Sequence, residues 1–301
     1  MIFTYSENKQ AFTKGHAMPL KHKSISKHYT VGDLEDQIFA ALKAAGKDLA
    51  RMTADDLKPI DAFHIRGLAA TKELATWAEI QKGAELLDVG CGLGGTSRYL
   101  ASAYNCKVAG LDLTEEYCRV AETLSARVGL ADRTSYKQGS ALEIPFADNN
   151  FDMVWTEHVQ MNIKNKQTFY KEIKRVLKPG GQLAFHDVFA GPAAAPRLPV
   201  PWAMDASINH LITVEDVRTL LAGLGFEKVC WEDKTEASAA FFRTAIKRLK
   251  TYERPSLGMH LLMGDDTEKK FANVLYNLEN QRIRVVQAVF QKACRPAAIS
   301  S

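Results

Sequence analysis

Glycines crowd a short span, ELLDVGCGLGGTSRYLA, in which an apolar run passes into a helical pattern. Gly90, Gly92 and Gly94 lack a β-carbon, so the chain can turn tightly there and bring its N–H groups against a ligand at a helix N-terminus. One carboxylate, Asp88, stands just before the turn. A second, Asp112, follows Gly90 by twenty-two residues and is placed to accept both hydroxyls of a ribose. This spacing predicts a site for a nucleotide-like ligand.

Two ligand classes use such a turn, and a tight turn with no ligand is a third interpretation. A dinucleotide fold also offers G-x-G-x-x-G with an acidic residue about twenty positions later. Here Asp88 stands two residues before the first glycine, where it would repel a pyrophosphate. The same carboxylate would attract an ammonium or a sulfonium group. The charge pattern therefore favours a cationic donor over a dinucleotide.

Four segments, DVGCGLG, GLDLT, GSALEIPFADNNFDMVWT and RVLKPGGQLAFHD, occur in this order between about residues 84 and 188. Their order and spacing resemble the class I S-adenosylmethionine-dependent methyltransferases. The resemblance implies S-adenosyl-L-methionine as cofactor. It places Asp88, Gly90, Gly92 and Gly94 along the methionyl part, Asp112 and Leu113 at the ribose, and Ser140, Ala141 and Leu142 beside the adenine. Many members carry an acidic residue where this chain has Ser140, so that contact departs from the family pattern.

Two further segments, KPIDAFHIRGLAATKELA and TEHVQMNI, are similar to the branch of glycine/sarcosine and sarcosine/dimethylglycine N-methyltransferases. That branch implies N-methylation of a small amino acid (glycine, sarcosine or dimethylglycine), ending at betaine. A carbon or oxygen methyltransferase acting on a quinol or natural-product ring stays open as the alternative. A nicotinamide oxidoreductase and a non-catalytic cofactor-binding protein are further alternatives, which Asp88 and the long segment after the fifth strand disfavour.

Methyl transfer from a sulfonium needs alignment and exclusion of water, and a base only if the nucleophile arrives protonated. The candidates for such catalytic work are His64, Glu157, His158 and His186, and Glu157 also counts among the cofactor residues. The candidates for substrate contact are Tyr29, Arg66 and Trp202. An arginine can clamp a carboxylate and aromatic faces can hold a methylated ammonium. If these residues do not contact a substrate, the arginine is expected to form a surface salt bridge and the aromatic residues to pack in the core. No metal ligand set is expected.

The elements that would position these residues alternate between strand and helix patterns. Apolar runs of strand length cover residues 84–89, 107–113, 133–138, 151–156, 182–188, 226–232 and 282–290. Such alternation predicts a parallel sheet with helices on both faces. The resemblance implies that it is a Rossmann-like, seven-stranded, mostly parallel sheet, and that the last strand is antiparallel.

Three regions are expected along the chain. Residues 1–30, with five lysines and one acidic residue, are predicted to be a mobile basic arm. Residues 31–80 are predicted to form an N-terminal helical cap. Residues 81–301 would then be the S-adenosylmethionine-binding methyltransferase domain. A lid insertion at about 190–212, after the fifth strand, is rich in proline and alanine and too long for an ordinary turn.

The composition limits the partners and the compartment. The net charge of +4 comes from the two ends of the 301-residue chain, and the middle is acidic, so no basic stripe suits a nucleic acid. The five cysteines are odd in number and scattered, and no two form a C-x-x-C pair, which is typical of a protein in a reducing cytosol. We expect a cytoplasmic protein with a small-molecule methyl acceptor and no stable membrane insertion. A homodimer is possible.

Overall fold

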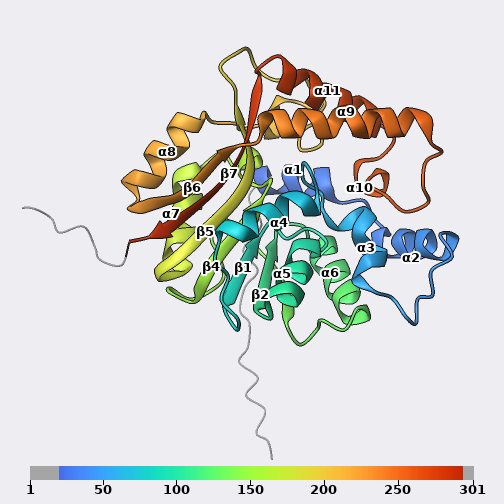
Figure 1. Ribbon diagram of the computed structural model, residues 1–301, viewed down its shortest axis with the longest axis horizontal. Helices are drawn as coiled ribbons and strands as arrows, with labels where there is room; N and C mark the ends of the chain where they lie inside the picture. Colours follow the sequence, from blue (N-terminus) through green and yellow to red (C-terminus); the bar gives the residue numbers. More distant parts are fainter. Residues whose placement is uncertain (1–19, 294–301) are drawn as a thin grey trace, which may run out of the picture.

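The structure is a computed structural model, and it describes residues 20–293. Its centre is a seven-stranded sheet with the strand order β3-β2-β1-β4-β5-β7-β6 (Figure 1). The strands are β1 Glu85–Val89, β2 Lys107–Asp112, β3 Thr134–Gln138, β4 Phe151–Glu157, β5 Leu177–Ala190, β6 Phe226–Asp233 and β7 Ile283–Lys292. All seven predicted strands are therefore present. β5 begins earlier than predicted, because Leu177 already pairs with Phe151.

The pairing between strands is parallel everywhere except around β7. β1 pairs in parallel with β2 and β4, β2 pairs with β3, and β4 pairs with β5. β7 runs antiparallel to both β5 and β6. This confirms the predicted fold class, including the antiparallel last strand. The carboxyl ends of β1, β2, β4 and β5 meet at one edge of the sheet, where ligands bind in such folds.

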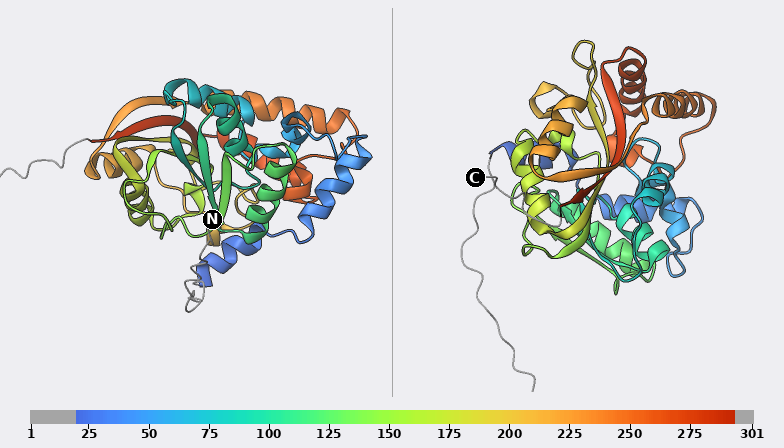
Figure 2. Two further views of the ribbon diagram at one scale, coloured as in Figure 1. Left: turned by 90° about the horizontal axis from the view of Figure 1, so that it is seen from below. Right: turned by 60° about the vertical axis from the view of Figure 1, so that its left-hand side comes forward.

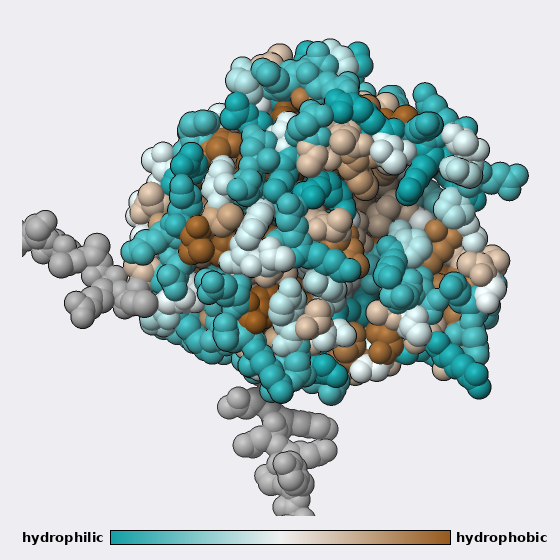
Figure 3. Space-filling model, viewed as in Figure 1, coloured by the Kyte–Doolittle hydropathy of each residue, from teal (hydrophilic) through white to brown (hydrophobic). Residues whose placement is uncertain are grey.

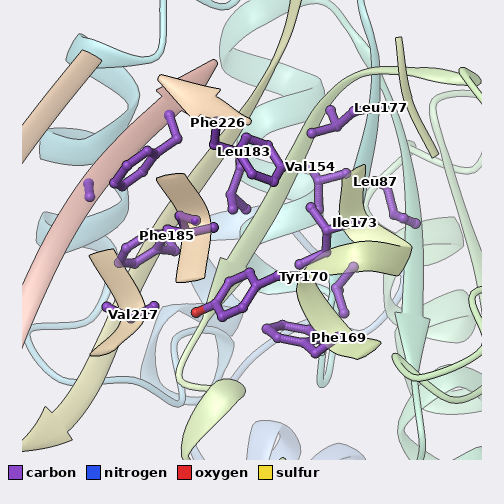
Figure 4. Close-up of a cluster of buried hydrophobic side chains, with 14 of the residues drawn as sticks. Leu87, Val154, Phe169, Tyr170, Ile173, Leu177, Leu183, Phe185, Val217 and Phe226 are labelled. Carbon is purple, nitrogen blue, oxygen red and sulfur yellow. The ribbon is translucent and has the colours of Figure 1, made fainter. Parts of the chain in front are cut away.

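One face of the sheet is covered by α7 Lys166–Val176 and α8 Val214–Gly223. The apolar side chains of α7 recur at helical spacing and pack against Leu87, Val154 and Leu183 of the sheet (Figure 4). α7 begins at Asn165, whose side chain accepts the Thr168 N–H, and it ends before the Pro-Gly-Gly segment. This packing fixes β4, which ends at Glu157 and is followed by His158, and β5, which carries His186.

The other face is covered by α4 Leu68–Trp77 and α5 Gly95–Tyr104. α6 Glu115–Arg127 lies beside α5, and the buried Arg98 guanidinium links the two helices. It donates to the Ser125 hydroxyl at 3.2 Å and reaches Asp61 at 2.5 Å. α5 begins at the glycine turn, so this network holds the helix N-terminus that faces the predicted ligand.

The N-terminal region contains α1 Leu20–Tyr29, α2 Leu34–Ala44 and α3 Ala54–Asp61. The structure differs from the predicted mobile arm at residues 20–29, which form a helix. Its Tyr29 hydroxyl donates to Asn162 at 2.9 Å, and His28 contacts the Pro201 carbonyl at 3.1 Å. The segment was interpreted from its lysines, whereas Ile25 and Tyr29 pack against buried hydrophobic clusters and attach it to the rest of the protein. Residues 1–19 of the predicted arm lie outside the described residues.

Three helices are inserted between β6 and β7, namely α9 Thr235–Thr251, α10 His260–Met263 and α11 Thr267–Glu279. Figures 1 and 2 show α9 and α11 side by side above the strands, on the same side of the molecule as α10. The two 3-10 turns are η1 Gln160–Asn162, after β4, and η2 Ala206–Ile208. No helix in residues 20–293 is long and apolar enough to cross a bilayer.

The segment from 190 to 212 runs from β5 toward α8 and is fastened at several points. Asn277 of α11 exchanges two hydrogen bonds with the Arg197 backbone, at 2.7 and 2.9 Å. Asn162 donates its two amide protons to the Trp202 and Ile208 carbonyls, both at 2.8 Å. These bonds hold the predicted lid segment over the carboxyl edge of the sheet.

Candidate functional site

A cavity of about 820 Å³ opens at the carboxyl edge of the sheet. Its floor is the glycine turn and the ends of β1, β2 and β4, and its roof comes from α1, η1 and the lid segment. The volume lies near the upper end of the range of about 300–1,000 Å³ that is typical for small-molecule sites. Of the predicted site residues, those lining it are Tyr29, His64, Asp88, Gly90, Gly92, Asp112, Leu113, Ser140, Ala141, Leu142, Glu157, His158 and Trp202. Gly94, Arg66 and His186 do not line it.

The three glycines of the turn serve different purposes. All have positive φ angles, 75° at Gly90, 52° at Gly92 and 78° at Gly94. A β-carbon on Gly90 would strike Val159, and one on Gly94 would strike the Tyr136 ring. A β-carbon on Gly92 would meet no protein atom within 4 Å and would point into the open cavity. Gly94 is therefore a packing residue, whereas Gly92 leaves space for a ligand.

Two carboxylates flank the turn. Asp88 is buried and accepts the Ser97 hydroxyl at 2.6 Å, and burial raises its pKa to about 7. Asp112 accepts the Gly92 N–H at 3.0 Å and the Thr114 N–H at 2.8 Å, and burial raises its pKa as well. Desolvation penalises the charged form of both acids. A cation placed in the cavity would stabilise their ionised forms.

The segment after β3 forms the far wall of the cavity. Ser140 accepts the Leu142 N–H on its hydroxyl oxygen at 3.1 Å, which sets a tight turn there. Ser140, Ala141 and Leu142 line the cavity together with Leu113. A hydroxyl keeps a donor proton and a second lone pair after this bond, so Ser140 can still accept from an amino group.

Glu157, at the end of β4, is the centre of a buried polar cluster. The Thr96 hydroxyl donates to it at 2.7 Å and the Thr71 hydroxyl at 3.1 Å. His64 Nε2 lies 3.2 Å from Glu157 Oε2. Both the His64 and Glu157 side chains are about 95% buried, with 5% and 4% of their surface exposed. The carboxylate is thus held rigidly against the imidazole.

The peptide of Ile65 is held between the two other candidate histidines. His158 Nε2 accepts the Ile65 N–H at 3.3 Å, and His186 Nε2 donates to the Ile65 carbonyl at 2.9 Å. His158 Nδ1 contacts the His186 carbonyl at 3.2 Å. Burial lowers the pKa of His186 to about 3 and that of His158 well below its usual value. Both rings are therefore neutral, and they fix the loop that carries His64.

The three imidazoles differ in which ring nitrogen is open. His64 Nε2 lies 3.2 Å from Glu157 Oε2 and 3.3 Å from the Thr71 hydroxyl, and a neutral ring that donates from Nε2 to the carboxylate would carry its lone pair on Nδ1. In the described part of the chain, His64 Nδ1 has no hydrogen-bond partner, and neither has His186 Nδ1. Both nitrogens of His158 are bonded. Of His64 and His186, only His64 lines the cavity, and its Nδ1 is buried without a hydrogen-bond partner among the described residues.

The predicted substrate residues lie in different surroundings. Trp202 is 2% exposed and lines the cavity, and its indole N–H donates to Asn209 at 2.9 Å. Tyr29 lines the cavity from α1. Arg66 pairs with Glu73 at 2.7 Å, outside the lining residues. Arg66 therefore forms a salt bridge, the structural alternative to the predicted substrate contact.

Several residues that line the cavity or hold its wall were missed in the sequence. Tyr117 of α6 has a buried hydroxyl with no partner among the described residues, and Asn162 ties α1 to the lid segment. Thr71 and Thr96 hold Glu157. Each occupies an ordinary helix or turn position in the chain. Their side chains converge only through the tertiary structure, so no local pattern marks them.

Residues 87–185 match the family model described as a methyltransferase domain. The chain is 27% identical to a sarcosine/dimethylglycine N-methyltransferase of Halorhodospira halochloris, over 71% of this chain and 75% of that protein. It is 39% identical to a probable chloroplastic tocopherol O-methyltransferase of Oryza sativa subsp. japonica, over 34% of this chain. The aligned part spans only 28% of that protein's length.

Among solved structures, the chain resembles a geranyl diphosphate C-methyltransferase of Streptomyces coelicolor A3(2). That structure contains Mg²⁺, geranyl diphosphate and S-adenosyl-L-homocysteine. The TM-score is 0.68 at 15% identity, with 93% of this chain and 100% of that one covered. These comparisons confirm a methyltransferase domain on the predicted fold, with S-adenosylmethionine as the cofactor of that domain. The relatives methylate nitrogen, oxygen and carbon, so they leave the acceptor open.

Proposed function

The chain contains a methyltransferase domain, and from that premise we propose that it moves the methyl group of S-adenosylmethionine onto a hydroxylated small molecule with an apolar body. The observation that carries the choice of acceptor is the buried, unpartnered Nδ1 of His64, a residue of the cavity wall whose other ring nitrogen contacts Glu157. A cytoplasmic location and a small-molecule partner, predicted from composition, accord with this proposal.

The donor would lie across the glycine turn. The residues that fit it are the N–H groups of the turn, Asp88 near its positive end and Asp112 at the ribose. The empty space above Gly92 lets the backbone approach the methionyl part closely. When bound, S-adenosylmethionine supplies the activated methyl group, and the protein contributes alignment and shelter from water.

His64 gives a reason to expect an acceptor that must lose a proton. A buried nitrogen with a lone pair and no partner costs free energy unless a ligand satisfies it. The Glu157 carboxylate keeps the proton of His64 on Nε2, so Nδ1 is the atom that would take the proton of a hydroxyl. The nucleophilic oxygen would then bond to the methyl carbon as the carbon–sulfur bond breaks.

The shape and lining of the cavity favour a large apolar acceptor over a free amino acid. The roof presents hydrocarbon and aromatic side chains, namely Ile25, Tyr29, Phe63, Met161, Trp202, Ile208 and Leu262. Arg66, the predicted clamp for a carboxylate, is engaged by Glu73 outside the cavity. Two lysines, Lys164 and Lys166, also line the cavity, so the case for an apolar acceptor depends on the hydrocarbon of the roof, to which a free amino acid offers little apolar surface.

N-methylation of a small amino acid is the second candidate. It is favoured by the alignment with the sarcosine/dimethylglycine N-methyltransferase, which extends over most of both chains. The same donor geometry would serve it. The two candidates differ in the acceptor that the roof of the cavity must hold.

Incubation with labelled S-adenosylmethionine and a panel of acceptors separates the two candidates. The panel contains 4-alkylphenols, alkylhydroquinones, glycine, sarcosine and dimethylglycine. We expect label in the phenolic compounds at initial rates at least about tenfold above those of the amino acids, because the apolar roof contacts a phenol ring and its alkyl group over a larger area. Preferential labelling of sarcosine or dimethylglycine would establish the second candidate instead.

The affinity for S-adenosylmethionine should fall as the pH decreases from 7 to 5. Asp88 has a pKa of about 7, so below that pH it is protonated in the free protein. The positive charge of the donor favours the ionised form of Asp88. Binding to the protonated protein must therefore release the Asp88 proton. The dissociation constant should rise by up to about tenfold per pH unit.

Calorimetry in buffers of different ionisation enthalpy measures both the affinity and the proton release. Asp88→Asn should bind the donor more weakly and lose the pH dependence over this range. A variant that keeps the wild-type pH profile would show that Asp88 does not face the positive charge.

A further inference from the structure

A second, smaller cavity of about 90 Å³ adjoins the first. It lies among the loop after α3, the lid segment and the helices α9, α10 and α11. Figure 1 shows these helices at one end of the molecule, and Figure 3 shows apolar side chains around a recess below α9. Nothing in the donor site described above uses this cavity.

The two cavities share part of their walls. The side chains that line both are Phe63, His64, His158, Pro201 and Trp202. His64, the proposed base, therefore stands at the boundary between them. A molecule bound beside His64 would reach the smaller cavity past Phe63 and Trp202, which border both cavities.

The lining of the smaller cavity selects for hydrocarbon. Apart from the two shared histidines, its walls are apolar: Ala62, Phe63, Ile65, Gly67, Pro201, Trp202, Phe241, Phe242, Met259, Met263 and Phe271. An ion or a phosphate would find no partner there. Methionine and phenylalanine side chains adapt to flexible or flat apolar groups. Phe241 is 37% exposed, so this wall reaches the surface of the molecule.

We propose that the smaller cavity is a subsite for an alkyl or prenyl extension of the methyl acceptor, next to the hydroxyl that His64 receives. The proposal rests on the proposed function and specifies its acceptor as an amphiphile with a hydrocarbon tail. A volume of 90 Å³ holds about three groups the size of a water molecule. A longer tail passes Phe241 toward solvent.

A homologous series of 4-alkylphenols, from methyl to hexyl, tests the subsite. Calorimetry on the full chain saturated with S-adenosylhomocysteine measures binding without any reaction. We expect the affinity to rise about three- to fourfold for each of the first three added methylenes and then to level off. A tail that stays in solvent would show no such rise.

Ala62→Leu adds bulk to the wall of the subsite, and we expect it to flatten the dependence on chain length to within about twofold over the series. Met263→Phe fills the cavity from α10 and should act in the same way, which covers the case that one variant fails to fold. Ala103→Leu, the same change on the exposed face of α5, is the matched control and should keep the wild-type dependence.

The outcomes separate the subsite from the proposed function. Affinity that grows with chain length, without methylation of any phenol, would support the subsite and overturn the proposed reaction. Methylation of phenols with affinity independent of chain length would overturn the subsite alone. A chain-length dependence that survives in both Ala62→Leu and Met263→Phe would also overturn it.

Discussion

Gly92→Val is expected to abolish detectable binding of S-adenosylhomocysteine in a protein that still folds. The added side chain would project into the cavity, where no protein atom lies within 4 Å of its β-carbon. The ligand would lose the close approach to the backbone that the turn provides. The dissociation constant should rise by more than about a hundredfold, a loss of about 2.7 kcal/mol. Calorimetric titration of the variant measures it.

The matched control is Gly129→Val. Gly129 also has a positive φ angle, 74°, and open space around its β-carbon, but it does not line the cavity. Both variants therefore carry the same kind of backbone strain, on the order of 1–3 kcal/mol. Thermal unfolding should show a similar loss of stability in the two proteins, and only Gly92→Val should lose the ligand. If both variants bind S-adenosylhomocysteine equally well, the glycine turn is not part of the donor site.

His64→Gln is expected to lower kcat for a weakly acidic phenol by about 10²–10⁴-fold, the usual contribution of a general base. Glutamine is of similar size but does not accept a proton at the position of Nδ1. Glu157→Gln should act in the same direction, because it removes the carboxylate that sets the tautomer of His64. Initial rates with labelled donor at saturating acceptor measure the effect.

An electron-poor phenol that is already ionised at the assay pH separates a base from a structural role. Such an acceptor has no proton to lose, so His64→Gln should slow it far less than the weakly acidic phenol. Circular dichroism and binding of S-adenosylhomocysteine serve as controls for the fold. If both phenols slow by the same factor, His64 is a packing or binding residue.

The two histidines beside His64 explain why a single loop carries the proposed base. His158 and His186 hold the two polar groups of the Ile65 peptide, one as acceptor and one as donor. Their pKa values are lowered by burial, so neither ring competes for a proton near neutral pH. They position the loop that places His64 in the cavity wall. This division of roles follows from contacts rather than from residue type.

The fold, and the cavity on which most of the proposed donor residues lie, could be predicted from the sequence. The alternation of apolar runs and helical patterns gave seven strands, and all seven are present in the structure. The glycine turn and the acids at 88 and 112 belong to one strand–turn–helix unit and the next strand. Local geometry therefore decides where they lie. Most of the predicted donor residues line the same cavity.

The acceptor side could not be predicted in the same way. Arg66 looked like a clamp for a carboxylate, but Glu73 lies one helical turn into α4 and pairs with it. His186 was expected at the cavity, yet it lies within β5, four residues before the end of the strand, and its ring is turned to the Ile65 carbonyl. The basic stretch at 20–29 looked solvated, yet Tyr29 reaches Asn162. In each case a partner distant in the chain, or on the next element, decided the role.

The sequence by itself determined the sheet, the glycine turn and the class of donor, because these depend on short-range periodicity and on backbone freedom at a few glycines. The tertiary structure alone decided which candidate histidines line the cavity, that Arg66 is already paired with Glu73, and which apolar side chains border the two cavities. Those properties arise where α1, the loop after α3, the lid segment and α9–α11 converge over the sheet edge. Side chains from separate elements have no fixed relation until packing brings them together, so no sequence spacing encodes their contacts.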